Sequence, residues 1–508
     1  PPRGADVARV VVVGAGVGGL AAAARLAAQG HRVVLHERAA THGGKLGEYR
    51  HDGFTFDTGP SLLTLPQVFT DLFAATGGPA DLQIEPVDPI CGYTFADGTR
   101  LDLPHDPAAV PAALDAALGP GSGAAWKALY DRSGRVWDLV GEPVLHRPLR
   151  ARDLARFGMR VADLRLVAPW RTLRGLGETL LPDPRLRMWL DRYATYSGSD
   201  PRLTPSVLAV TAYVEQRFGA WWVRGGLRRL ADALLDRCRG LGVEVHLGSE
   251  VAAVTTGGRG VTGVRLADGR AVPADVVVSD ADATALYGTL LRPSAVVPRL
   301  GAAAARIALG RAQASVSGFV LLLALDGTPE GTAARPAHRV FFAPDYDAEF
   351  DALFRQPAPV VDPTVYVHAP GEPGSAPPGC EAWFVLVNAP PHDPAPGSSS
   401  GVDWDAPGLR ERYADRVLEV LARRGADVRD RVRWREVRTP ADLERATASP
   451  GGAIYGTASH GARAALLRPA NRSPVRGLYL VGGSAHPGGG LPIVALSAAI
   501  VAGAIGPA

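Results

Sequence analysis

A glycine motif between two apolar runs constrains the fold more than any other feature of this 508-residue chain. Residues 9–13 are typical of a strand, 18–29 of a helix and 32–37 of a second strand, and the motif Gly14-x-Gly16-x-x-Gly19 lies at the first turn. A strand, a glycine turn, a helix and a second strand make a βαβ unit, which belongs to parallel sheets covered by helices. The N-terminal region is therefore predicted to be a Rossmann-like α/β domain.

Each residue of this motif has a physical role in holding a dinucleotide. Gly14 permits the tight turn, Gly16 lets the backbone approach a pyrophosphate, and Gly19 lets the helix pack on the strand. The free N–H groups at the helix N-terminus attract the pyrophosphate. Glu37 follows Gly19 by 18 residues and is placed to accept hydrogen bonds from ribose hydroxyls. A carboxylate there would repel the 2′-phosphate of NADP, so NADP is disfavoured.

FAD and NAD share such a cradle, and a second glycine turn near the C-terminus favours FAD. Residues 477–481 are strand-like and lead into the turn 482–490, which opens an apolar helix. A glycine turn at a helix start again suits an anion or a dipole, and the long FAD molecule needs a second site of this kind. The candidate FAD-binding residues are Gly14, Gly16, Gly19, Glu37, Lys45, Gly59, Pro60, Ser61, Val251, Gly482, Gly483, Ser484, Pro492 and Ile493.

Charge and cysteine content exclude several other classes. Basic residues exceed acidic ones only by 54 to 51 and are spread along the chain, so nucleic acid is not a favoured partner. The three cysteines are far apart and match neither a disulfide framework nor a metal-ligand spacing, so no metal is predicted. The start of the chain lacks a secretory pattern, and 493–505 is too short to cross a bilayer. We expect a cytoplasmic protein.

Several sequence blocks, taken in order, point to one family. Besides the two glycine turns, the blocks are Gly43-Gly44-Lys45, Asp57-x-Gly59-Pro60-Ser61, 221–227, 263–281, 376–381 and 468–474. Their order and spacing over nearly the whole chain resemble the flavin-dependent carotenoid desaturases of the bacterial phytoene desaturase type. These enzymes belong to the wider amine oxidase-like flavoproteins.

The resemblance implies a discontinuous FAD-binding domain with an inserted α+β substrate domain. The FAD domain would comprise residues 1–85, 220–290 and 460–508, and the substrate domain residues 86–219 and 291–459. The implied activity introduces double bonds into a phytoene-like carotenoid, with hydride transfer to flavin N5 and proton loss. The implied electron acceptor is a quinone or oxygen.

Some alternatives stay open at this point. The turn Gly482-Gly483-Ser484 lacks the acidic residue of many superfamily members, and the form of 486–492 differs from phytoene desaturases. A later-acting 1-hydroxycarotenoid 3,4-desaturase or a carotenoid isomerase is therefore a rival. An amine oxidase is disfavoured because 484–492 contains no aromatic residue. A non-catalytic prenyl-binding escort of the GDP-dissociation-inhibitor type is the rival from another class.

Two residues are candidates for the catalytic proton acceptor. His486 lies in the C-terminal turn, although a hydrogen-bonded turn histidine is the commoner role. Asp57 is the second candidate, although a carboxylate in such a loop more often caps or fixes the backbone. Lys45 either contacts the pyrophosphate or flavin ring or is a solvated loop lysine.

The segment 147–192 combines arginines with apolar residues. One interpretation is a pair of basic amphipathic helices that lie on anionic lipid, at the inner face of the plasma membrane, while a hydrophobic substrate enters. The other is an ordinary solvated face in an arginine-biased protein.

Overall fold

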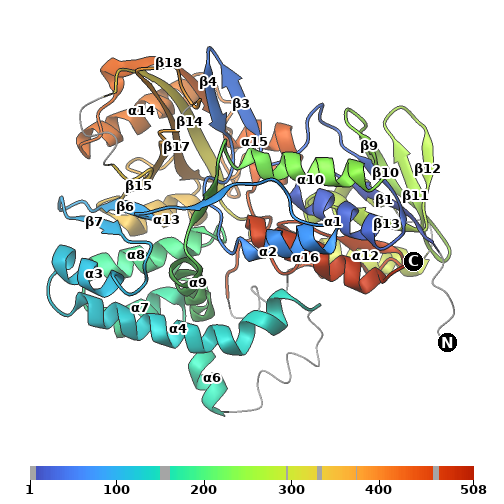
Figure 1. Cartoon of the computed structure of the whole chain (residues 1–508), viewed down its shortest axis with the longest axis horizontal. Helices are drawn as coiled ribbons and strands as arrows, with labels where there is room; N and C mark the ends of the chain where they lie inside the picture. Colours follow the sequence, from blue (N-terminus) through green and yellow to red (C-terminus); the bar gives the residue numbers. More distant parts are fainter. Residues whose placement is uncertain (1–6, 149–160, 293–295, 329–334, 373, 462–467) are drawn as a thin grey trace.

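The structure is a computed structural model that describes residues 7–148, 161–292, 296–328, 335–372, 374–461 and 468–508. It has a parallel-sheet half and a half built from a second sheet and a layer of helices (Figure 1). In the described part of the chain, no helix is both long and apolar enough to cross a membrane.

The first half is built on a five-stranded parallel sheet. Its strand order is β19-β13-β1-β2-β9, with bounds Leu478–Leu480, Val276–Ser279, Arg9–Val13, Arg32–His36 and Glu244–His246. Strands from the N-terminal, middle and C-terminal parts of the sequence therefore form one sheet, as a discontinuous Rossmann-like domain requires. The exact domain boundaries stay a prediction.

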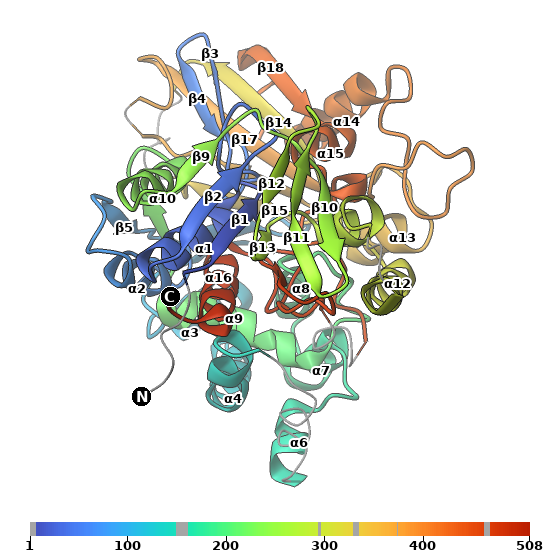
Figure 2. The same ribbon diagram turned by 90° about the vertical axis from the view of Figure 1, so that its right-hand side faces the viewer.

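Three helices pack against one another and against this sheet. The glycine turn opens α1 (Val17–Ala28), which packs against α10 (Arg228–Gly240) and α16 (Leu491–Ile505) in the same apolar core. The helix α1 is rich in alanine and every alanine from 21 to 24 is fully buried, because small side chains let the helices approach closely. Figure 2 shows α1 and α16 side by side beneath β1 and β2. The apolar C-terminal helix is thus a core helix.

An antiparallel meander extends the first half. It consists of β10, β11 and β12, with bounds Val251–Gly257, Gly260–Leu266 and Ala271–Pro273. The meander leads directly into β13 of the parallel sheet.

A seven-stranded mixed sheet forms the upper part of the second half. Its order is β18-β14-β17-β16-β15-β6-β7, with bounds Val432–Arg438, Ser317–Asp326, Cys380–Ala389, Val365–His368, His338–Phe341, Cys91–Thr94 and Arg100–Leu103. The central strands β14 and β17 pair antiparallel along ten residues each. One face packs on α14 (Leu409–Arg423), and the other meets the hairpin of β3 (Glu48–His51) and β4 (Phe54–Asp57).

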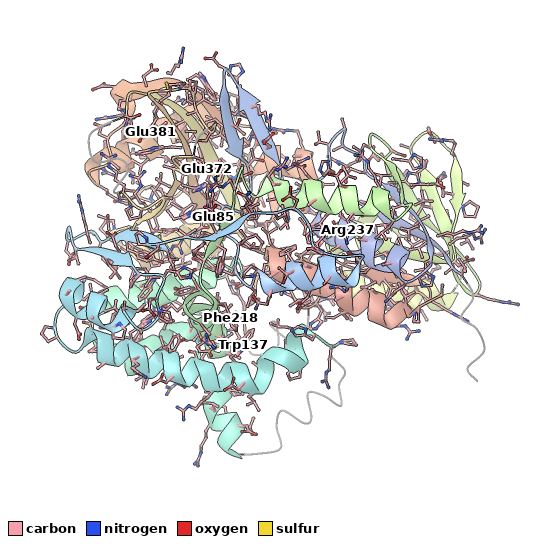
Figure 3. The ribbon with its side chains drawn as sticks, viewed as in Figure 1. Glu85, Trp137, Phe218, Arg237, Glu372 and Glu381 are labelled. Carbon is pink, nitrogen blue, oxygen red and sulfur yellow. The ribbon has the colours of Figure 1, made fainter. Side chains whose placement is uncertain are left out.

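Helices form the lower layer of the second half (Figure 1). They are α3, α4, α6, α7, α8 and α9, with bounds Val110–Leu118, Ser122–Leu145, Val161–Val167, Leu173–Leu180, Pro184–Thr195 and Val210–Phe218. The Trp126 and Trp189 rings of α4 and α8 stack with centroids 3.9 Å apart. Trp137 of α4 and Phe218 of α9 make a further contact, with centroids 5.8 Å apart (Figure 3).

The remaining elements connect these layers. They are α2 (Gln67–Ala75), β5 (Ile84–Pro86), β8 (Trp221–Val223), α11 (Ala283–Ala285), α12 (Val296–Arg311), α13 (Tyr346–Phe354) and α15 (Pro440–Thr447). Short single-turn helices lie at 206–209, 286–290, 429–431 and 450–452.

The membrane interpretation of 147–192 is wrong for its C-terminal part. Leu186, Trp189 and Leu190 are buried in the protein core, and Arg174 pairs with Asp191 and Asp347. These side chains therefore cannot face lipid. Residues 149–160 of the same segment lie outside the described residues, and Trp170 is exposed over 68% of its surface.

Candidate functional site

A cavity of about 1430 Å³ runs from the glycine motif to the second sheet and the helices below it. A pocket for one small ligand typically measures about 300–1,000 Å³. The cavity is lined by Gly14, Gly16 and Glu37 at one end and by residues of α8, α9, β14, β16 and β17 at the other. Its size and its two chemically different ends suit a cofactor together with a substrate.

The N-terminal glycine turn has the predicted geometry. Gly14 has φ 102°, which favours glycine, and its N–H donates to the His36 carbonyl at 2.8 Å. A Cβ on Gly19 would lie 2.0 Å from the Gly14 carbonyl oxygen, so helix and turn can meet only without a side chain there. The turn therefore presents bare backbone at the start of α1.

Glu37 lies just past β2 and faces this turn. Its Oε2 accepts a hydrogen bond from the Ala15 N–H at 2.7 Å, and its Oε1 accepts one from the Ala39 N–H at 2.8 Å. A carboxylate has about four acceptor sites, so it retains lone pairs for ribose hydroxyls. The position of Glu37 on the cavity wall fits its predicted role.

Asp280 is a site residue that the sequence analysis missed. It follows β13, and its carboxylate lies near the backbone amides of Gly16 and Gly19 at the start of α1. Cβ atoms on Gly16 and Gly482 would lie 2.3 and 2.4 Å from its carboxylate oxygens, so the side chain joins both glycine turns. Burial raises the pKa of Asp280 to about 7. Its place just after the apolar run 276–278 is the signal that could have revealed it.

Lys45 is held in the cavity wall, so its interpretation as a solvated loop lysine is wrong. Its Nζ donates to the carbonyl oxygens of Ala453 and Ile454 at 2.8 and 2.7 Å. Burial lowers the pKa of Lys45 to about 8, and the charges of Asp280 and Asp282 oppose that shift. Lys45 therefore ties the N-terminal block to the segment before the second glycine turn.

The second glycine turn is fixed by two side chains. Arg468 donates to the carbonyl oxygen of Gly483 at 2.9 Å and to that of Tyr455 at 2.8 Å. The Ser484 hydroxyl accepts a hydrogen bond from the Ala283 N–H at 2.9 Å. Arg468 belongs to a sequence block that was recognised, but no pattern assigned it this role. Its burial lowers the pKa to about 10.

The remaining predicted cofactor residues line the same cavity. They are Gly59, Pro60, Ser61, Val251, Gly483, Ser484, Pro492 and Ile493. A Cβ on Gly59 would lie 1.9 Å from the Lys45 carbonyl oxygen, so this loop also requires glycine. The Ser61 hydroxyl is hydrogen-bonded to the Tyr366 hydroxyl of β16. The structure thus brings the predicted residues together from four parts of the sequence.

The two predicted catalytic residues have structural partners. The Asp57 carboxylate accepts hydrogen bonds from the N–H groups of Leu227 and Arg228 at 2.7 and 3.2 Å, at the start of α10. A ring nitrogen of His486 lies 3.0 Å from the Arg147 carbonyl oxygen, and the His486 carbonyl accepts from Asn471. These contacts favour the structural alternative for each residue, and their catalytic roles stay predictions.

The donors and glycines of this cavity fit a long dinucleotide cofactor. The two glycine turns meet at Asp280, and Glu37 lies at one end of the cavity. Lys45 and Arg468 hold the backbone of the segments beside the second turn through hydrogen bonds to carbonyl oxygens. In the described ranges, no group of three or more histidine, cysteine or acidic residues could hold a metal ion.

The comparisons with known proteins agree with this site. The model of the family described as flavin containing amine oxidoreductase matches residues 17–506. The 4,4′-diapolycopene oxygenase of Methylomonas sp is 35% identical over 98% of this chain and 97% of the relative. The hydroxyneurosporene desaturase of Cereibacter sphaeroides is 35% identical with the same coverage. The lycopene-forming phytoene desaturase of Pseudescherichia vulneris is 31% identical over 96% of this chain and 97% of the relative.

Solved structures share the fold. An oxidoreductase from Methanosarcina mazei superposes with a TM-score of 0.62 at 19% identity, covering 96% of this chain and 98% of the other. Putrescine oxidase bound to putrescine superposes with a TM-score of 0.65 at 15% identity, covering 98% and 99%.

The fold and the site together define an FAD-dependent oxidoreductase. The chain belongs to the flavin-containing amine oxidoreductase family, in the branch that contains the carotenoid desaturases.

Proposed function

We propose that the protein is an FAD-dependent carotenoid desaturase. The observation that carries the proposal is the continuity of the cofactor cradle with an apolar chamber in one cavity. The chamber is lined by Leu62, Ile90, Leu208, Val214, Val320, Phe384 and Leu386, among others. Such a lining suits an extended hydrocarbon, and the curated relatives that carry desaturase names act on carotenoids by those names.

The protein contributes orientation and a dry environment. Bound FAD would supply the two-electron oxidation of a carbon–carbon single bond, and the neighbouring polyene would spread the developing positive charge. The walls from β14, β17, α8 and α9 hold the chain beside the cradle and exclude water. The protein accelerates the reaction mainly by positioning the substrate beside the cofactor. Such a reaction needs no nucleophilic triad, and the sequence shows none.

The electron acceptor and the membrane contact are also proposals. We infer a quinone or oxygen as the acceptor, on the strength of the family resemblance. We place the protein on the cytoplasmic side and propose that the surface around the exposed Trp170 touches the bilayer, because carotenoids partition into lipid. Co-sedimentation of W170A with anionic liposomes tests this contact, and unchanged binding would refute it.

Incubation of FAD-loaded protein with carotenoids tests the proposed activity. The panel contains phytoene, neurosporene and a hydroxylated neurosporene, each delivered in liposomes with a quinone. We expect products whose absorption lies at longer wavelength, because each new double bond extends the conjugation. A product whose mass shows a new oxygen atom would instead support an oxygenase, the activity named for the Methylomonas relative. A product that differs only in cis–trans geometry would support the isomerase alternative.

A further inference from the structure

A polar cluster lies in the apolar chamber, away from the glycine turns. We call it the Arg192 cluster, and it consists of Arg192 of α8, Tyr196 just after α8, Glu215 of α9, Tyr346 at the start of α13 and Tyr366 of β16. All five residues line the cavity. The cluster is unexpected because a plain hydrocarbon offers it no hydrogen bond.

Part of the cluster is internally satisfied. The Arg192 Nη1 donates to the Tyr196 hydroxyl at 2.6 Å, and that hydroxyl donates to the Glu215 Oε2 at 3.0 Å. The Tyr193 hydroxyl donates to the Glu215 Oε1 at 2.6 Å. Burial raises the pKa of Glu215, and the two phenolic donors together with the charge of Arg192 oppose that rise and favour the ionised form. The negative charge of Glu215 then offsets the positive charge of Arg192 within the same wall.

Two side chains of the cluster have hydrogen-bond donors without a partner among the described residues. Among the described residues, the Arg192 side chain has one hydrogen-bond partner, whereas a guanidinium carries five N–H donors. Its central carbon lies 5.1 Å from the Tyr196 ring centroid and 5.9 Å from the Tyr366 ring centroid, so aromatic faces cover part of it. Within the same ranges, the Tyr346 hydroxyl is buried without a partner, and the charge of Arg192 acts on it.

Unpaired donors in a dry chamber are costly unless the substrate brings an acceptor. A hydrocarbon end would leave the Arg192 N–H groups and the Tyr346 hydroxyl without partners. A carboxylate end is disfavoured, because Glu215 already balances the charge of Arg192. An uncharged oxygen matches both the donors and the charge balance.

We propose that the Arg192 cluster is a subsite for an uncharged oxygen, a hydroxyl or carbonyl, on the end of the polyene substrate. The subsite makes the protein select oxygen-bearing carotenoids over hydrocarbons of the same length. This inference rests on the proposed function, because it assumes that a carotenoid enters the chamber.

The test compares matched substrates in the FAD-loaded protein and three variants. The substrates are one carotenoid hydrocarbon and its terminal hydroxyl and terminal aldehyde derivatives, and the measured quantity is kcat/KM for each. For the wild-type protein we expect the hydroxyl or the aldehyde to be favoured by about tenfold or more, the effect of leaving a buried donor unpaired. The preferred derivative identifies the oxygen group.

The variants separate recognition from structure. R192M removes the guanidinium, and Y346F removes only a hydroxyl that has no partner in the described protein. Both variants should reduce the preference to less than about threefold, either by raising kcat/KM for the hydrocarbon or by lowering kcat/KM for the oxygenated substrate. Y346F should leave the thermal midpoint unchanged or raise it. If the hydroxyl had a structural role, its removal would lower the midpoint. R187M is the control, since Arg187 lies on the same helix and its Nη2 bonds the Pro182 carbonyl outside the chamber.

The possible failures are distinguishable. Conversion of the hydrocarbon with no preference for oxygen, or an equal preference in wild type, R192M and Y346F, overturns the subsite and leaves the desaturase proposal standing. Failure of FAD-loaded protein to convert or bind any of the three polyenes overturns the proposed function and the subsite together.

Discussion

The carboxylate of Asp280 lies against Gly16 at the start of α1, so close that a Cβ on that glycine would be 2.3 Å from Oδ2. A negative side chain therefore occupies the part of the cradle where helix α1 presents its free N–H groups. A second anion, the pyrophosphate, is expected in the same place. The two negative charges disfavour each other unless Asp280 is protonated.

Asp280 should make FAD affinity depend on pH. Its pKa is about 7 in the folded protein, raised by burial, and the pyrophosphate should raise it further, so binding takes up a proton. The dissociation constant should therefore increase above pH 7, by up to about tenfold per pH unit for one linked proton. D280N should show a flat profile and tighter binding at pH 8. Titration of apoprotein with FAD by flavin fluorescence measures both, and an identical slope in D280N would disprove the linkage.

The same shift affects the stability of the apoprotein. The folded pKa of Asp280 lies above the ordinary aspartate value of 3.8, so its stabilising contribution is complete below that value and is lost as pH rises to about 7. D280N should therefore raise the thermal midpoint at pH 8 relative to wild type and lose this advantage near pH 4. Thermal melts of both proteins at these two pH values provide the check.

Lys45 should contribute to the stability of the fold. K45M leaves the Ala453 and Ile454 carbonyls without their donor, which should cost about 1–3 kcal/mol in the free energy of unfolding. K127M is the matched control, because Lys127 is exposed and pairs with Asp131 one turn away. Urea denaturation of both variants gives the difference. Equal midpoints for K45M and K127M would show that the two carbonyl contacts add nothing.

Glu37 should be needed for the adenosine end of FAD. E37Q keeps one acceptor oxygen but cannot accept from both the Ala15 and Ala39 N–H groups, since one of its atoms becomes a donor. We expect FAD affinity to fall by about tenfold, roughly the value of one hydrogen bond to a charged group. Equilibrium dialysis with FAD measures this loss, and unchanged retention of FAD by E37Q would argue against the assigned role.

Asp57 should act on stability more than on turnover. D57A removes the acceptor at the start of α10, which should cost about 0.5–2 kcal/mol, as for other helix caps. We expect kcat of the folded, FAD-loaded variant to stay within a few-fold of wild type. A loss of more than about 100-fold in kcat with an unchanged thermal midpoint would restore the catalytic role.

The cofactor cradle could be predicted from sequence because its determinants are local. Gly14, Gly16 and Gly19 lie within six residues, and Glu37 follows one helix and one strand later. The role of Asp280 can be predicted only if β13 is known to lie beside β1 in the sheet. Strand order is a tertiary property, so no local pattern reveals it.

The substrate chamber could not be predicted in the same way. Arg192 and Glu215 come from two helices that are near each other in the sequence, whereas Tyr366 comes from a strand much later in the chain. Arginine is so common in this chain that the sequence offers only a lipid-facing or a solvated interpretation for the segment 147–192, which includes Arg192. Its side chain instead faces the interior, since α8 buries Leu186, Trp189 and Leu190 against the core.

Anaerobic mixing of the FAD-loaded protein with one equivalent of a carotenoid tests the central claim most directly. Both chromophores are followed at once, the visible band of the flavin and the band of the polyene. We predict that the flavin band bleaches as the polyene band moves to longer wavelength, with one new double bond formed per flavin reduced. A polyene that binds in the chamber while both bands stay unchanged, for each carotenoid in the panel, would contradict the assignment as a desaturase.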